Sequence, residues 1–169
     1  MIVTKAIKPK KLKQDKFRLA FLSGMHKVGR DTVKEYQKTV ATWAHKVTFE
    51  YLVSLQQQGP TMTAGVSGGE GAQIWRYVNE GTRPHVILPK GDKSLAFQSG
   101  YNAKTTPGLI SSKAGGAYGD VVFARGVLHP GTEPRDFDKA IVKVVEPIFT
   151  DEMHTAMRKA AQASGHGMR

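Results

Sequence analysis

The sequence predicts an α+β fold in which an antiparallel sheet of about four strands packs against a long N-terminal helix and a C-terminal helix. Three observations predict it. Apolar residues recur every three or four positions over residues 14–44 and again after residue 137, they alternate over residues 47–53, and segments rich in glycine and proline separate these patterns. Both helices carry one apolar face, so packing them on one side of the sheet buries both faces and leaves the other side of the sheet free for water or a neighbour.

The 169 residues fit one folded domain. We expect a basic arm over residues 1–13, a single α+β domain over residues 14–163 and a flexible tail over residues 164–169. The formal charge is +11, from 25 Lys and Arg residues against 14 Asp and Glu residues, and the excess is concentrated near the N-terminus. Such a charge attracts polyanions and acidic protein surfaces. The arm is either a solubilising extension or a segment that orders against DNA or an acidic partner.

The composition excludes several functional classes. The chain has no cysteine, which excludes disulfides, thiolate catalysis and sulfur-ligated zinc sites. It has no apolar run of about 18 residues, the length that a membrane-spanning helix requires. Charged residues occupy the N-terminal segment where a signal peptide carries its apolar stretch. We therefore expect neither a membrane span nor secretion.

The first element is a helix over residues 14–44, which contain no proline. Gly24 and Gly29 lie inside it, and each weakens a helix by about 1 kcal/mol relative to alanine. We therefore expect either a break or a close helix contact near them. The residues of its apolar face are Phe17, Phe21, Met25, Val28, Thr32, Tyr36, Val40 and Trp43.

Two strands and a short helix follow. Val47, Phe49, Tyr51 and Val53 share one face of a half-buried strand, and residues 61–67 can pair back onto it. Residues 72–79 then show the spacing of a two-turn helix.

The segment after the short helix is a helix-to-strand junction. Gly81 occupies the position where a helix C-cap requires a left-handed residue. Pro84 biases Arg83 towards an extended conformation, so a strand should begin at His85. Pro89 and the glycine at position 91 interrupt this strand before residues 94–97 resume it.

Residues 98–120 combine Gly, Ser, Lys and Asn with few large apolar side chains. We expect an extended loop or a long hairpin here, in which Val121, Phe123 and Arg125 alternate against their neighbours. Such a segment is too polar to fold alone. It is either a surface loop without a role or a projection that orders on a partner, with Lys104 and Lys113 as its candidate contacts.

The segment 127–137 predicts a turn that introduces the last helix. Pro130 and Gly131 suit the second and third positions of a turn, and Thr132 or Asp136 could cap the helix that follows. An apolar stripe then runs from Phe137 to residue 157, and the proline at position 147 should kink it.

No pattern indicates a catalytic, cofactor or metal site. His85 and His129 each adjoin a proline, and with Glu80 or Asp136 they could form a metal site or an acid–base pair, as a hydrolase would need. The chain contains neither a His-Glu-x-x-His motif nor a paired-carboxylate spacing. We therefore expect both histidines to have structural hydrogen-bonding roles, and we expect no enzyme activity.

Two motifs carry a resemblance to a known family. They are YVNEGTRPHVILPK, followed by LAF, and GVLHPGTEPRDF, followed by an alanine-containing helix. In this order and spacing they resemble tail-completion or head-tail joining (neck) proteins of long-tailed double-stranded DNA phages. In that family, an extended Pro-His stretch follows a Gly-Thr pair, and a His-Pro-Gly-Thr-x-Pro-x-x-Phe turn introduces the last helix. The match covers residues 75–140 and does not explain the basic arm or the glycine-rich middle.

The resemblance implies a structural virion protein. Such a subunit forms a ring, taken as six-fold, at the neck between head and tail, and is assembled in the host cytoplasm. Its partners are copies of itself, a head connector or head-closure protein, the tail tube protein and the genomic DNA that passes through the lumen. The resemblance leaves open whether the ring terminates the tail or closes the head. The alternative is a basic nucleic-acid-binding protein that acts outside a virion.

Within this interpretation two sets of residues have assigned roles. The scaffold positions are Gly81, Pro84, His85, His129, Pro130 and Gly131. The candidate contacts to a partner or to DNA are Lys5, Lys8, Lys10, Lys11, Lys13, Lys104 and Lys113.

Overall fold

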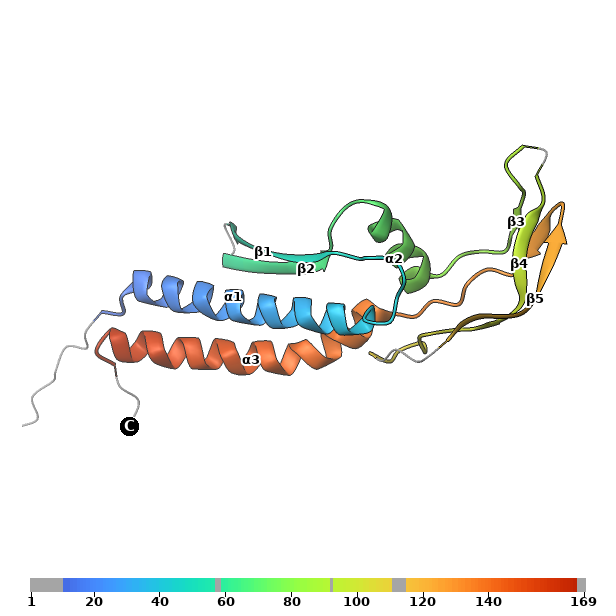
Figure 1. Ribbon diagram of the computed structural model, residues 1–169. Coiled ribbons are helices and arrows are strands. Elements are labelled where there is room, and N and C mark those ends of the chain that lie inside the picture. Colours follow the sequence, from blue (N-terminus) through green and yellow to red (C-terminus); the bar gives the residue numbers. More distant parts are fainter. Residues whose placement is uncertain (1–10, 57–58, 92, 111–114, 167–169) are drawn as a thin grey trace, which may run out of the picture.

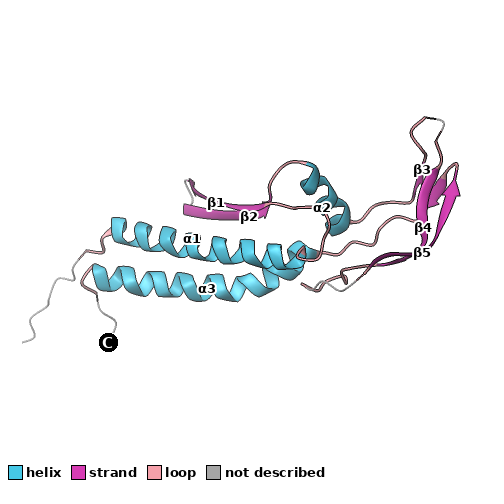
Figure 2. Cartoon of the chain, viewed as in Figure 1, coloured by secondary structure: helices cyan, strands magenta, loops and turns pink. Residues whose placement is uncertain are grey.

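The protein has an α+β fold. The computed structural model describes residues 11–56, 59–91, 93–110 and 115–166, and these form three helices and three two-stranded antiparallel sheets. The single sheet of about four strands expected from the sequence is absent from these ranges. Each strand instead pairs with one partner, because the glycine- and proline-rich segments separate the strand pairs along the chain (Figure 2).

Two long helices form the body of the molecule. Helix α1 (Gln14–Thr39) and helix α3 (Phe137–Ala163) lie side by side and antiparallel (Figure 1). Gly24 is in contact with α3, where an added Cβ would lie 2.8 Å from Cε of Met153, so the glycine permits close helix packing. Helix α1 is continuous through both of its glycines and ends five residues earlier than predicted. None of the helices in the described ranges has the length and hydropathy needed to cross a bilayer.

A β-hairpin covers helix α1. Strand β1 (Phe49–Gln56) pairs with strand β2 (Gly59–Val66) in a register that places Phe49 opposite Val66 and Gln56 opposite Gly59. As the alternation predicts, Phe49, Tyr51 and Val53 are the more buried positions at this end of β1. The ring of Tyr51 lies directly over Gly29 of α1, so this glycine also permits a close contact.

The core is aromatic and lies where all three helices meet. Helix α2 (Glu70–Glu80) contributes Trp75, which is almost completely buried. Its ring centroid lies 4.9 Å from that of Phe49, 5.1 Å from that of Phe137 and 5.5 Å from that of Tyr36. Edge-to-face and tilted arrangements of this kind add to the free energy gained by burying the rings. The core therefore joins α1, β1, α2 and α3.

The remaining four strands form a long ribbon beyond this body (Figure 1). Strand β3 (His85–Ile87) pairs with β6 (Val127–His129), and β4 (Leu95–Asn102) pairs with β5 (Gly116–Ala124). The segment after β4 returns to the body, where Gly108 N–H donates a 2.8 Å hydrogen bond to Arg135 O and Ile110 packs against the core. Within residues 98–120, expected to form a loop or a hairpin, the extended parts therefore belong to the paired strands β4 and β5. The turn around Gly108 and Ile110 is attached to the body.

Candidate assembly interface: the stalk, the ribbon arm and the open groove

The two motifs found in the sequence lie side by side. We call residues 81–84 and 130–134 the stalk, because they connect the body to the ribbon arm, residues 85–102 and 116–129. Thr82 and Thr132 exchange backbone hydrogen bonds of 3.0 and 3.1 Å across the stalk, and Thr132 N–H also lies 3.0 Å from Oγ1 of Thr82. The sequence indicated both segments but not their pairing, because nothing local relates residues fifty positions apart.

Two glycines make this pairing possible. Gly81 and Gly131 have φ values of 77° and 91°, which L-amino acids with a side chain rarely adopt. A Cβ on Gly81 would lie 2.5 Å from Thr132 O, and a Cβ on Gly131 would collide with Thr82 O. The positive φ predicted at Gly81 is confirmed, but its ψ of 176° is extended and is not the left-handed helical conformation that we expected.

The two predicted structural histidines form a cross-strand pair. His85 lies opposite His129, with ring centroids 5.1 Å apart. Nδ1 of His85 lies 2.9 Å from Arg83 O, while Gly131 N–H donates a 3.0 Å hydrogen bond to Nδ1 of His129. Each ring thus holds the backbone of its own stalk strand. His129 carries its proton on Nε2 when neutral, because its Nδ1 accepts this hydrogen bond.

Neither partner proposed for the histidines joins them in a metal cluster. The described residues contain no group of three His, Asp or Glu side chains placed to hold a metal ion. Asp136 instead accepts a 2.8 Å ion-pair contact from Lys139. The histidine pair therefore lies where the arm joins the stalk, and the described residues place no metal-ligand set around it.

Asn79 caps helix α3, and the sequence did not indicate this role. Asp136 occupies the N-cap position with φ 52°, but neither it nor Thr132 provides the side-chain cap that we expected. Oδ1 of Asn79 instead accepts a 3.2 Å hydrogen bond from Asp138 N–H, and Nδ2 of Asn79 donates one of 2.8 Å to the Asp138 carboxylate. Helix α2 therefore supplies the cap of α3, an arrangement that local patterns cannot reveal.

The same carboxylate also binds helix α1. The Tyr36 hydroxyl donates a 2.9 Å hydrogen bond to Oδ1 of Asp138. Burial first, and then the hydrogen bond and negative charge of Asp138, raise the pKa of Tyr36 well above its ordinary value of 10.0. The three helices thus meet in one polar network at the base of the stalk.

The ribbon arm exposes large apolar side chains. Val86 and Leu128 lie opposite each other and are 61% and 71% exposed. On strand β5, Val121 and Phe123 are 58% and 71% exposed, and their cross-strand neighbours are Gln98 and Ala96. Large exposed apolar side chains gathered on one part of a protein are typical of interaction sites.

The total surface area supports this conclusion. The chain exposes 12609 Å², whereas a compact monomer of 18.5 kDa exposes about 8,200 Å². Residues outside the described ranges account for at most about 3,200 Å², the value for unfolded chain of that length. More than about 1,000 Å² of excess surface therefore belongs to the described residues.

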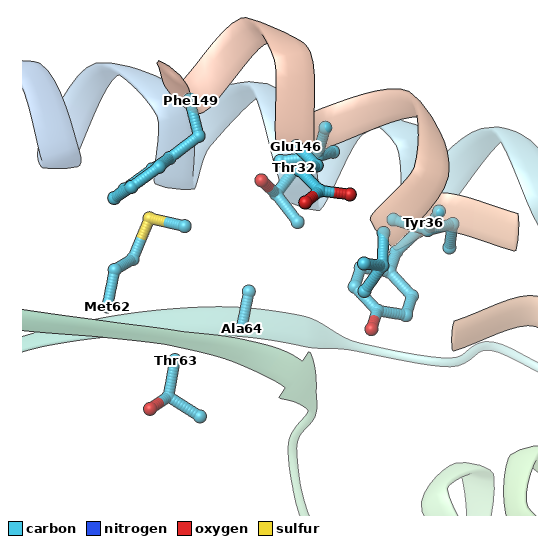
Figure 3. A pocket seen from close by; sticks show the side chains of 10 residues that line it. Thr32, Tyr36, Met62, Thr63, Ala64, Glu146 and Phe149 are labelled. Atoms are coloured by element: carbon cyan, nitrogen blue, oxygen red, sulfur yellow. The ribbon is translucent and has the colours of Figure 1, made fainter. Parts of the chain in front are cut away.

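An apolar groove lies on the body between β2 and the two long helices. Its cavity of about 480 Å³ is lined by side chains of α1, β2 and α3. In Figure 3, Met62 and Phe149 point towards each other across it, Glu146 lies along its helical side, and Thr63 points away from it. The sequence did not indicate this groove, because its three walls come from segments far apart in the chain.

The predicted contact lysines have different surroundings. Nζ of Lys104 donates a 3.1 Å hydrogen bond to Thr42 O, so it attaches the segment after β4 to the turn that follows α1. Lys11 and Lys13 are exposed immediately before α1. The other four positions, Lys5, Lys8, Lys10 and Lys113, lie outside the described residues. Lys104 thus lies near the C-terminal end of α1, whereas Lys11 and Lys13 lie near its N-terminal end, so the length of the helix separates them.

Comparison with known proteins gives no assignment. No protein-family model matches the chain, and neither the curated proteins nor the solved structures include a significant match. The function must therefore be inferred from the residues and geometry of the stalk, the ribbon arm and the groove.

Proposed function

We propose that the protein is a structural subunit of a tailed-phage virion, forming a ring at the neck that completes the tail and joins it to the head connector or head-closure protein. The genomic DNA passes through the lumen of the ring. The proposal assigns no catalytic step and no cofactor. It starts from the resemblance of the two motifs to tail-completion and head-tail joining proteins.

The observation that supports the proposal most strongly is the ribbon arm. Its apolar side chains are exposed and its strands have open edges in the described chain. Isolated two-stranded ribbons are marginally stable, and open edges promote uncontrolled association. Closed symmetric assembly covers such surfaces in every copy. A ring subunit is therefore a physically consistent role for this chain.

The net charge of +11 favours the second candidate function, a basic nucleic-acid-binding protein acting outside a virion. That function requires tight DNA binding by the isolated chain with a steep salt dependence. Removing residues 1–10, which contain Lys5, Lys8 and Lys10, should then reduce the slope of log affinity against log salt by up to about three. Weak binding that the deletion leaves unchanged would exclude it.

The test of the neck function is a phage whose gene for this chain is disrupted. We expect electron micrographs to show separate filled heads and tails, and we expect complementation with the wild-type chain to restore joined virions. Labelled chain should then lie at the collar. Normal virions without the chain, or a complemented virion that lacks the label at the collar, would contradict the neck function.

A further inference from the structure

Strand β2 has a free edge beside the groove. It pairs with β1 along its other edge and has no second partner among the described residues. The groove is bordered by β2, whose Met62 and Ala64 side chains face it, and by no residue of β1, so the free edge of β2 is the edge that faces α3. An extended segment could add to such an edge by backbone hydrogen bonds.

Helix α3 gives the space beside this edge an apolar floor. Val142, Val145 and Phe149 line it, and Val142 is 57% exposed. These positions span about 10 Å along the helix. Glu146 is exposed among them and takes part in no ion pair among the described residues. The groove therefore has the features that would accept an apolar strand carrying one positive charge.

Strand β5 of the ribbon arm has the complementary features. Val121 and Phe123 project from the same face, about 7 Å apart along the strand. Arg125 follows two residues later and is exposed. One edge of β5 pairs with β4, and the other has no partner in the described chain. The arm lies beyond the end of α1 and α3, held there by the paired stalk, so it does not reach the groove of its own chain (Figure 1).

We propose that β5 of one copy pairs with the free edge of β2 in a second copy, forming a four-stranded sheet in the order β1, β2, β5, β4 across the two chains. Val121 and Phe123 then cover the apolar floor on α3, and Arg125 lies near Glu146. This inference rests on the proposed function in one respect: the proposed ring would be built from copies joined by this contact.

The exposed area identifies the occupant as a second copy. Each chain has one arm and one groove, so every copy would give its arm to one neighbour and receive an arm from the other. Interfaces of standard size bury about 1,200–2,000 Å² in total, so a copy with two such neighbours covers about 1,200–2,000 Å² of its own surface. The excess surface of the described residues, more than about 1,000 Å², is of this order. Because the arm and the groove are different surfaces, the contact is heterologous and closes into a ring or continues as a filament.

Cross-linking tests which surfaces meet. The chain has no native cysteine, so single cysteines can be placed without background. We would mix full-length chains carrying Phe123→Cys with chains carrying Val142→Cys under assembly conditions and add a short bismaleimide. The expected product is a covalent dimer containing one chain of each kind. The matched control replaces the Val142 variant with Leu52→Cys, another exposed apolar position, on β1.

Three results of this experiment would overturn the docking proposal. They are equal cross-linking of the Phe123 variant to the Leu52 control, predominant cross-linking between two Phe123 variants, and absence of cross-links in oligomers that do form. The predominant Phe123–Phe123 product would identify a contact between two arms instead.

Charge reversal provides a second test in the same assemblies. Arg125→Glu and Glu146→Arg should each weaken association about tenfold, because each replaces an attraction with a repulsion. The double variant should recover most of the loss, while Glu50→Arg, at an exposed position on β1, should change little. Equal losses in the single and double variants would contradict the pairing of Arg125 with Glu146.

The failures of the two proposals are distinguishable. Rings that form on tails without the predicted cross-link would refute this contact and leave the neck function in place. Cross-linked oligomers from a chain whose loss leaves virions normal would refute the neck function and leave the contact in place.

Discussion

At the residue scale, Gly131 has both a backbone conformation and a contact that exclude a side chain. Its φ is 91°, and an added Cβ would collide with Thr82 O and lie 3.1 Å from Pro84 N. We expect Gly131→Ala to lower the free energy of unfolding by about 3 kcal/mol, since it combines backbone strain with a clash against the paired stalk strand. Urea denaturation followed by circular dichroism measures the change.

Gly108 provides the matched control for this prediction. Its φ of 70° is also positive, but an added Cβ would meet no atom within 4 Å. Gly108→Ala should therefore cost only about 1 kcal/mol, the strain of a left-handed residue. Equal losses in the two variants would mean that the stalk contact around Gly131 contributes nothing.

Tyr36 makes the stability depend on pH above its ordinary pKa. The folded protein raises the pKa of Tyr36 above the unfolded value of 10.0, so its neutral form is favoured by folding. This contribution is fully present below pH 10.0 and is lost as the pH rises above it, because the unfolded chain then ionises while the folded chain does not. We expect the free energy of unfolding to fall more steeply above this pH in the wild type than in Tyr36→Phe. Parallel pH profiles for the two proteins would contradict this role.

At the element scale, two glycines in α1 should respond oppositely to the same substitution. Alanine stabilises a helix interior by about 1 kcal/mol relative to glycine. At Gly24 the nearest obstacle is the flexible end of Met153, which can move, so Gly24→Ala should be neutral or stabilising. At Gly29 the obstacle is the Tyr51 ring, which also contacts His26 edge-to-face with centroids 5.9 Å apart.

Gly29→Ala should therefore lower the free energy of unfolding by about 1–3 kcal/mol, as overpacking does in cores. Thermal and urea unfolding of the two variants measure the difference. A stabilised Gly29→Ala protein would show that the β1–β2 hairpin can move away from α1 at little cost.

The elements themselves could be predicted well where one face is apolar. The periodicity of Met25, Val28, Thr32 and Tyr36 correctly identified the buried face of α1. The end of α1 was predicted too late because Val40 and Trp43 continue the apolar spacing, although Trp43 lies after the helix and packs near Trp75. Apolar spacing records which side chains are buried, and a turn after a helix can bury them equally well.

Which strands pair with each other could not be predicted from the sequence. The local alternation around Phe49 predicted a strand correctly, but a period of two does not say which strand lies beside which. The stalk residues were identified individually, whereas their pairing and the cap that Asn79 gives to α3 depend on contacts over 50 or more residues. The groove could not be predicted for the same reason.

At the scale of the whole molecule, the exposed surface makes stability depend on concentration. If the excess area is covered by other copies, association stabilises the folded chain by mass action. Each tenfold increase in protein concentration should then add about 1 kcal/mol per chain, which corresponds to a rise in Tm of about 2–4 °C for a chain of this size. Scanning calorimetry over a hundredfold concentration range measures this dependence.

The paired variant Val121→Ser with Phe123→Ser separates assembly from folding. Both side chains are largely exposed, so their loss removes little burial within one chain and should leave the Tm at the lowest concentration almost unchanged. The rise in Tm with concentration should disappear, because the surface that recruits the next copy is gone. Leu52→Ser, at an exposed apolar position outside the arm, should keep the wild-type dependence. A wild-type Tm that is independent of concentration, with or without tail tubes, would show that the exposed arm is not covered by other copies of this chain.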